Sequence, residues 1–211
     1  YMINIYNVSK KIKGKQILTN INYEFNEGLI YGLCGPNGSG KTMILRLIAG
    51  LIHPTEGRVE VDGKVLNKYN SFPSSVGIII ENMELLPQLN AYENLKLLSQ
   101  IKDIATDNDI FNVLERVDLK SDQIVKKYSL GMKQRLNIAQ AIFEKPQLLL
   151  LDEPTNALDE SGIKLVHKIL LEEKKRGACI IIATHNKEDI NVLCDKILRV
   201  TDGCMEEINV Y

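Results

Sequence analysis

Residues 35–42 read Gly-Pro-Asn-Gly-Ser-Gly-Lys-Thr and match the pattern GxxxxGK[ST] of a phosphate-binding loop. Glycines let backbone N–H groups wrap around phosphate oxygens, and the helix expected to follow adds the positive end of its dipole. The Lys41 side chain is long enough to reach β- and γ-phosphates, and the Thr42 hydroxyl is a suitable Mg²⁺ ligand. We therefore predict a phosphate site made of Gly35, Asn37, Gly38, Ser39, Gly40, Lys41 and Thr42.

Two carboxylates follow one another at the end of an apolar run, at Asp152 and Glu153. A continuous run of leucines before them is typical of a strand buried on both faces. At the tip of such a strand, Asp152 would organise the Mg²⁺ shell and Glu153 would orient and polarise an attacking water. The same residues alone also describe a strand that ends in a charged turn, so the phosphate loop is what favours the catalytic interpretation.

Residues 128–135, Tyr-Ser-Leu-Gly-Met-Lys-Gln-Arg, connect these two motifs. They resemble the LSGGQ signature of ATP-binding cassette (ABC) proteins: residues 129–131 match it, and residues 132–133 replace its second glycine and its glutamine. Residues 154–159 resemble the D-loop of the same family, and His185 stands where the family has its switch histidine. Because all the motifs occur in the family's order and spacing, the resemblance covers essentially the whole chain.

The resemblance implies a role for each of these further residues. His185 would contact the γ-phosphate of ATP and hold the attacking water, so that most of the rate comes from positioning and charge stabilisation. Ser129 and Gly131 would cap the γ-phosphate bound by a second cassette. Two ATP molecules would then be buried between two head-to-tail cassettes, which form a homodimer or a paralogous heterodimer.

Two residues depart from the family pattern. Ile12 occupies the slot that usually holds an aromatic residue stacked on adenine, so we expect it to face adenine without stacking. Glu81 occupies the Q-loop position, whose usual glutamine touches Mg²⁺ and water and links the site to the membrane domain. A carboxylate keeps the oxygen ligand and adds a charge, so we predict that Glu81 joins Thr42 and Asp152 around Mg²⁺.

The elements that must position these residues alternate along the chain. Apolar strands are expected at residues 29–34, 76–80, 147–151 and 179–184, and helices at 43–49, 91–100, 130–144 and 163–175. This alternation predicts an α/β fold with a central, mostly parallel sheet. The stretch from about 82 to 145 lacks strands and predicts an inserted α-helical lobe. The resemblance implies one P-loop NTPase domain of the ABC cassette type over residues 1–211, with an N-terminal antiparallel β subdomain.

The composition bounds the partners. With 26 Lys and Arg against 27 Asp and Glu, the formal net charge is -1, so we expect no nucleic-acid partner. No apolar run approaches the length of about 18 residues that a membrane span requires. A transporter would therefore need a separate integral-membrane permease. We expect the chain to be cytoplasmic and peripheral on the cytoplasmic face of the cell membrane.

Residues 186–189, Asn-Lys-Glu-Asp, raise one competing interpretation because they match the NKxD motif that reads guanine in GTPases. His185, directly before this segment, already has a role in the ABC family. A polar helix start, with Glu188 and Asp189 in the first turn, explains the same residues.

The subtype rests on residues 79–95 and 129–135, which resemble the bacitracin-resistance and lantibiotic-immunity exporters. This implies an ATP-hydrolysing subunit, dependent on Mg²⁺, that powers the export of a peptide antibiotic or another amphiphile. Two alternatives stay open: a non-transport ABC-type ATPase, and a regulatory subunit that binds ATP without turnover. The presence of both Glu153 and His185 argues against the second.

Overall fold

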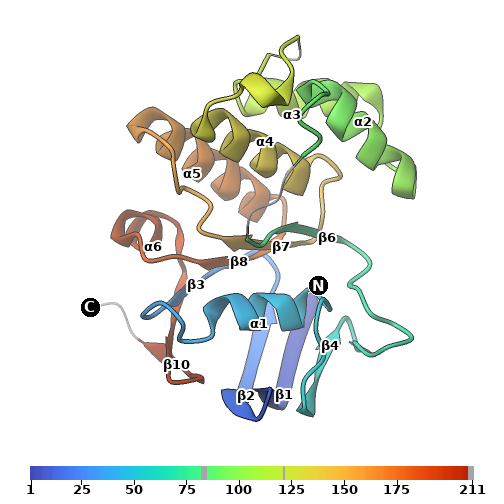
Figure 1. Cartoon of the computed structure of the whole chain (residues 1–211). Coiled ribbons are helices and arrows are strands. Elements are labelled where there is room, and N and C mark those ends of the chain that lie inside the picture. Colours follow the sequence, from blue (N-terminus) through green and yellow to red (C-terminus); the bar gives the residue numbers. More distant parts are fainter. Residues whose placement is uncertain (82–84, 121, 209–211) are drawn as a thin grey trace.

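Two β-sheets form the framework of the chain in the computed structural model, which describes residues 1–81, 85–120 and 122–208 (Figure 1). The smaller sheet has the strand order β2-β1-β4-β5, and its neighbouring strands are antiparallel. This confirms the expected N-terminal antiparallel subdomain. Its strands are β1 (Met2–Ile12), β2 (Lys15–Asn26), β4 (Glu56–Val61) and β5 (Lys64–Val65).

The larger sheet has the order β10-β9-β3-β8-β7-β6. All its neighbours pair in parallel except β10, which lies antiparallel to β9 at one edge. The central, mostly parallel sheet is therefore confirmed. Its strands are β3 (Ile30–Cys34), β6 (Val76–Ile79), β7 (Leu148–Asp152), β8 (Cys179–Ala183), β9 (Lys196–Thr201) and β10 (Cys204–Ile208).

The leucine run of β7 shows why the large sheet is buried on both faces. Side chains alternate across a strand, so Leu149 and Leu151 belong to the core on one face, while Leu148 and Leu150 belong to the core on the other. None of the four is measurably exposed. The strand is therefore held from both sides, and it presents Asp152 at its end.

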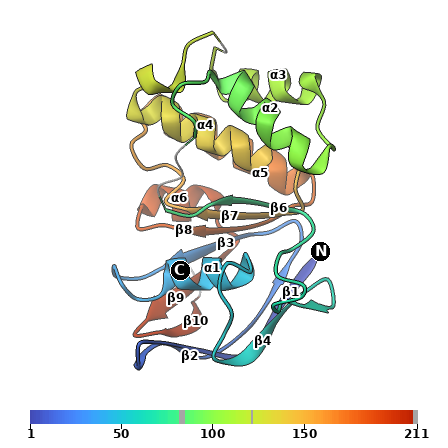
Figure 2. The ribbon, with the colours of Figure 1, turned by 45° about the vertical axis from the view of Figure 1, so that its right-hand side comes forward.

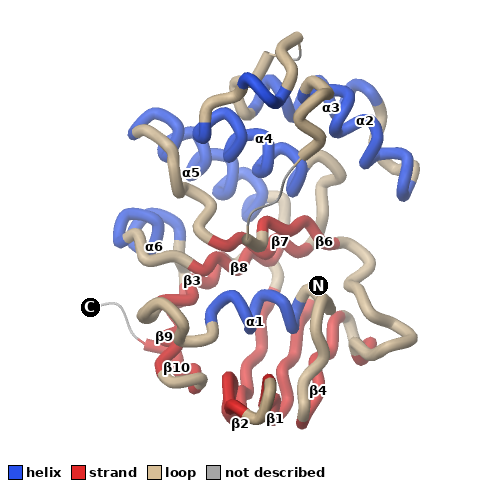
Figure 3. Tube along the Cα trace, in the orientation of Figure 1, coloured by secondary structure: helices blue, strands red, loops and turns tan. Residues whose placement is uncertain are grey.

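Helices cover both faces of this sheet (Figures 2 and 3). Helix α1 shares a core with the smaller sheet, whereas α2, α3, α4 and α5 contribute to the core on the opposite face. The helices are α1 (Lys41–Ile48), α2 (Ala91–Lys102), α3 (Asp107–Arg116), α4 (Leu130–Ile142), α5 (Glu160–Lys175) and α6 (Lys187–Leu193), with a 3₁₀ turn η1 (Val125–Lys127).

The stretch assigned to the helical lobe contains α2, α3, η1 and α4 in sequence. Within it, Leu136 and Ala139 of α4 are fully buried, as the helical period predicts. Asn82, where we place the beginning of the lobe, lies outside the described residues. The boundaries of the lobe stay a prediction.

No helix in the described ranges combines the length and the apolar character needed to cross a bilayer.

Candidate active site

The loop between β3 and α1 has a shape that only glycine allows at two positions. Gly35 and Gly40 have φ values of 149° and 112°, in the region that side chains rarely adopt. A Cβ on Gly35 would lie 2.0 Å from the carbonyl oxygen of Val200, and one on Gly40 would lie 2.7 Å from Cδ2 of Leu18. The glycines therefore allow the loop to curl tightly against β9 and β2, at the N-terminus of α1.

Two buried polar groups of this loop point to an anionic ligand. Lys41 is 7% exposed, and its Nζ donates to the carbonyl oxygens of Gly35, at 2.8 Å, and Pro36, at 3.0 Å. Oγ of Ser39 is buried without a hydrogen-bond partner among the described residues. An ammonium carries three donors, so Lys41 has one left for a phosphate oxygen. The Ser39 hydroxyl can also donate to a phosphate oxygen.

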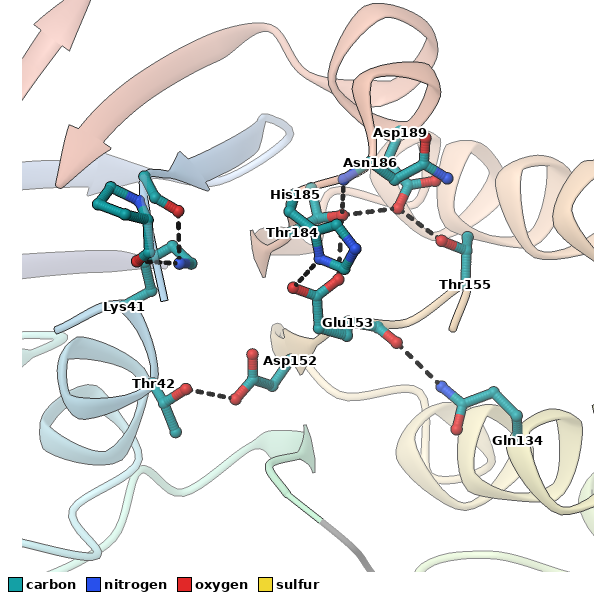
Figure 4. Close-up of polar contacts among 12 residues, drawn as sticks. Lys41, Thr42, Gln134, Asp152, Glu153, Thr155, Thr184, His185, Asn186 and Asp189 are labelled. Carbon is teal, nitrogen blue, oxygen red and sulfur yellow. Dashed lines mark hydrogen bonds and ion pairs between the residues drawn. The ribbon is translucent and has the colours of Figure 1, made fainter. Parts of the chain in front are cut away.

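Thr42, the first turn of α1, meets the tip of β7. Its Oγ1 donates to Oδ2 of Asp152 at 2.6 Å (Figure 4). Burial raises the pKa of Asp152, a change that the Thr42 hydroxyl opposes and the neighbouring Glu153 charge reinforces. A desolvated carboxylate beside a hydroxyl favours a cation, and both oxygens are ligands that Mg²⁺ prefers.

The donor set fits Mg²⁺ better than a metal held in an all-protein cage. Within the described ranges, no group of three or more His, Cys, Asp and Glu side chains is arranged to hold a metal. Thr42 and Asp152 would leave most positions of an octahedral shell to phosphate oxygens and water, which is the usual mode of Mg²⁺ binding.

Glu153 and His185 form a close pair at the ends of adjacent strands, β7 and β8. Nδ1 of His185 lies 2.8 Å from Oε1 of Glu153, and the imidazole is 72% exposed (Figure 4). Because an ionised carboxylate only accepts, Nδ1 carries the proton. Nε2 of the exposed ring can then accept from a water when the imidazole is neutral, and it can donate to a phosphate oxygen when the ring is protonated. The backbone N–H of Glu153 also donates to the carbonyl of Ala183 at 2.8 Å, which ties the two strand ends together.

Eight of the predicted site residues line one cavity of about 850 Å³, although they come from distant parts of the sequence. The size is within the range of sites for small molecules and cofactors. Among the predicted site residues, the lining includes Asn37, Gly38, Gly40, Lys41, Thr42, Glu81, Asp152 and Glu153. The fold therefore brings the two motifs to one place, as the sequence predicts.

Glu81 lies in the same lining and has an unexpected partner. Its carboxylate, 61% exposed, forms an ion pair with Arg46 of α1. Glu81 also has a positive φ of 61°, which is uncommon for a residue with a side chain. Its role toward Mg²⁺ stays a prediction, and Arg46 is a residue that the motif analysis missed.

Six predicted residues lie outside the cavity lining: Ile12, Gly35, Ser39, Ser129, Gly131 and His185. Ile12 ends β1, is 39% exposed, and pairs with Lys15 across the β1–β2 turn. Ser129 is exposed and caps α4, where its Oγ accepts from the N–H of Met132 at 3.1 Å. Gly131 follows in the first turn of α4. Contacts of these residues with a nucleotide remain predictions.

Gln134 is a further residue that supports the site, although the motif analysis gave it no role. Nε2 of Gln134 in α4 donates to the carbonyl oxygens of Glu153, at 3.3 Å, and Pro154, at 2.9 Å. This bond joins the helix after Ser129 to the turn after β7. Gln134 directly follows the two replaced positions of the signature motif. Its place in that segment is the sequence feature that could have marked it as a site residue.

The segment that resembles NKxD begins α6. The side chain of Asn186 caps the helix by accepting from the N–H of Glu188 at 2.9 Å, and Asp189 in the first turn is fully buried. The helix-start interpretation is therefore confirmed, and Asp189 has protein partners instead of a guanine base.

Comparisons with known proteins agree with this geometry. The family model described as ABC transporter matches residues 18–156. The chain is 61% identical over 207 residues to the ABC transporter ATP-binding protein YybJ of Bacillus subtilis (strain 168), covering 97% of this chain and 95% of that protein.

Two relatives have names that include a cargo. The chain is 35% identical to the lantibiotic transport ATP-binding protein SrtF of Streptococcus pyogenes, covering 96% of this chain and 88% of SrtF. It is also 35% identical to the bacitracin transport ATP-binding protein BcrA of Enterococcus faecalis, covering 100% of this chain and 70% of BcrA.

A solved structure matches the fold. The ATP-binding cassette MJ0796, described as dimeric in a post-hydrolysis state with ADP and Pi, has a TM-score of 0.84 and 26% identity. The match covers 99% of this chain and 100% of that one.

Proposed function

Because this chain belongs to the ABC transporter family as an ATP-binding subunit, we propose that it hydrolyses ATP to power a separate membrane permease. The proposal rests on the Glu153–His185 pair, because Glu153 lines the same cavity as Asp152 and the phosphate loop and is in contact with His185. A chain that only bound ATP would have no need of a carboxylate and an imidazole held 2.8 Å apart.

Each side chain has a distinct task in this proposal. Lys41 and the loop N–H groups bind the β- and γ-phosphates and neutralise their charge. Glu153 accepts a hydrogen bond from the attacking water and aligns it with the γ-phosphorus. Nε2 of His185 donates to a γ-phosphate oxygen when the ring is protonated, or accepts from the water when the ring is neutral. As the new P–O bond forms, the bond to the bridging oxygen breaks, and ADP and phosphate leave.

Thr42 and Asp152 are the residues that would hold Mg²⁺, with Glu81 beside them. When bound, the ion would neutralise charge on the phosphoryl group in transfer. The site residues themselves position the reactants, which is where most catalysis of phosphoryl transfer arises.

In this proposal, Ser129 and Gly131 act on the nucleotide that a second cassette binds. Ser129 is exposed at the N-terminus of α4, outside the lining of its own cavity. The N–H groups at a helix N-terminus favour an anion. In a head-to-tail dimer they would face the γ-phosphate held by the partner's phosphate loop, and closure of the dimer would complete the site.

The names of the relatives support the kind of cargo. SrtF and BcrA are named for lantibiotic and bacitracin transport, so we propose export of a peptide antibiotic or another amphiphile. The chain would sit on the cytoplasmic face of the membrane, bound to the cytoplasmic side of its permease. Co-purification with the permease from detergent-solubilised membranes tests this part.

Steady-state phosphate release tests the catalytic part. Glu153→Gln should lower kcat by about 100-fold or more, because the amide is a poor acceptor for the water's proton. Its affinity for ATP should stay within about twofold of wild type. Glu115→Gln, at an exposed position of α3, is the matched control and should hydrolyse ATP normally. Equal activity of Glu153→Gln and wild type would remove Glu153 from the reaction.

A further inference from the structure

Asp189 is a fully buried carboxylate that accepts three hydrogen bonds from three different segments. Oγ1 of Thr155 donates to its Oδ2 at 2.6 Å, and Oγ1 of Thr184 donates to the same oxygen at 3.0 Å. Nε2 of His167 lies 2.7 Å from Oδ1. The donors are themselves nearly inaccessible, with exposures of 6% for Thr155, 0% for Thr184 and 5% for His167.

Two of the three donors lie close in sequence to Glu153 and His185. Thr155 follows Glu153 by two residues in the turn after β7, and Thr184 directly precedes His185 at the end of β8 (Figure 4). His167 comes from α5. One carboxylate at the start of α6 therefore holds the two segments that carry Glu153 and His185 against one helix.

The directions of the bonds are fixed by chemistry. An ionised carboxylate only accepts, so Nε2 of His167 carries the proton and both hydroxyls donate. A hydroxyl has one proton, and Oγ1 of Thr184 lies 3.0 Å from Asp189 but 3.4 Å from Oε2 of Glu153. The shorter bond takes that proton, which leaves the Glu153 carboxylate to His185.

We propose that Asp189 is a positioning residue of the ATPase site. It sets the distance between Glu153 and His185 by pinning Thr155 and Thr184 to a common oxygen. His167 anchors that carboxylate from α5. The inference rests on the proposed function, and it gives Asp189 a task distinct from binding nucleotide.

The matched pair Thr155→Val and Thr155→Ser tests the proposal with little risk to folding. Valine has nearly the shape of threonine but no donor, and Asp189 keeps two of its three partners. We expect Thr155→Val to lower kcat by about tenfold, the factor for losing one charge-assisted hydrogen bond. KM and the affinity for ATP should change by less than about twofold, and Thr155→Ser should restore kcat. His167→Leu and His167→Gln form a second pair with the same expectation, because glutamine can still donate.

Imidazole NMR provides a readout that does not depend on activity. The chain has three histidines, His53, His167 and His185. In Thr155→Val the His185 signals should shift, those of the exposed His53 should not, and Thr155→Ser should return them to their wild-type positions.

The outcomes separate the two proposals. A wild-type chain without ATPase activity, but with the shift at His185 and its reversal, would contradict the proposed function and support the positioning role. Unmoved His185 signals in Thr155→Val would overturn the positioning role. So would a fall in kcat that serine does not restore.

Discussion

Asp152 and Glu153 are adjacent carboxylates in different surroundings. Asp152 is half-buried against Thr42, and burial raises its pKa. Glu153 projects toward solvent and His185, with 27% of its side chain exposed. Opposite faces of the same strand end thus supply one carboxylate suited to a cation and one suited to a water.

The change Asp152→Asn separates stability from function. The amide oxygen can still accept from Thr42, and no charge is then desolvated, so the nucleotide-free protein should melt higher by about 2 °C. Mg²⁺-dependent ATPase activity should be lost. Thermal melts and phosphate release on the same preparation measure both effects. A lower melting temperature would mean that the Asp152 charge stabilises the free protein.

Glu81→Gln tests the departure at the Q-loop position. The change keeps an oxygen ligand but removes the charge and the ion pair with Arg46. We expect substantial ATPase activity, with the Mg²⁺ concentration for half-maximal rate raised by about threefold or more, since neutral oxygens bind Mg²⁺ less well. The measurement is activity across a Mg²⁺ titration beside Glu115→Gln. Superimposable curves would exclude Glu81 from the metal's surroundings.

At the level of single residues, the motifs could be predicted from the sequence, but the residues that contact and position them could not. The phosphate loop and Asp152 are contiguous patterns with a fixed chemical meaning. Arg46 and His167 act through partners far away in the sequence, so no spacing marks them. Asp189 did appear in a pattern, but its burial, rather than the pattern, shows what it does.

At the scale of elements, the continuous leucines of β7 predicted a central strand, and the structure confirms it. The two-residue strand β5 and the edge strand β10 carry little apolar periodicity. Their burial patterns are mostly exposed, because each lies at the edge of its sheet. The positions of β5 and β10 are set by pairing with a neighbouring strand and not by an apolar pattern of their own. The sequence pattern therefore does not predict these two strands.

Helix α3 begins with a capping box that contains a titratable group, the carboxyl of Asp109. Oδ2 of Asp109 accepts from the N–H of Thr106 at 2.9 Å, and Nζ of Lys145 donates to Oδ1 at 2.7 Å. The Lys145 ammonium and the Thr106 donors hold the pKa of Asp109 well below its ordinary value of 3.8. A lowered pKa in the folded state gives stability that is present above 3.8 and is lost as the pH falls through the folded-state pKa.

Asp109→Asn should therefore destabilise the protein in a pH-dependent way. At about pH 7 we expect a melting temperature lower by about 2 °C, because the ion pair with Lys145 is gone. The difference from wild type should shrink as the pH falls below about 4, where Asp109 of the unfolded wild type becomes protonated. Thermal melts of both proteins over this range measure it, with Asp122→Asn as an exposed control. A difference that does not change with pH would contradict the role of the charge.

At the scale of the whole molecule, the large sheet separates two hydrophobic cores. One contains α1 and strands of the smaller sheet, and the other contains the helices from α2 to α5. The phosphate loop leads into α1 in the first layer, whereas Ser129 caps the N-terminus of α4. Helix α4 lies in the second layer (Figure 2). A movement of the helical layer relative to the sheet would therefore change where Ser129 lies without disturbing the phosphate loop.

In the function proposed above, two copies of this cassette, or this chain and a paralogue, close over ATP. Light scattering of Glu153→Gln with and without Mg²⁺-ATP tests the homodimer most directly, because this variant should bind ATP without releasing the dimer through hydrolysis. We expect a mass near 23.8 kDa without nucleotide and twice that mass with it. Adding Ser129→Arg should return the mass to that of one chain, because a bulky cation blocks the facing site. A variant that binds ATP but keeps the mass of one chain, alone and mixed with its paralogous cassette, would show that the cassettes do not close over ATP.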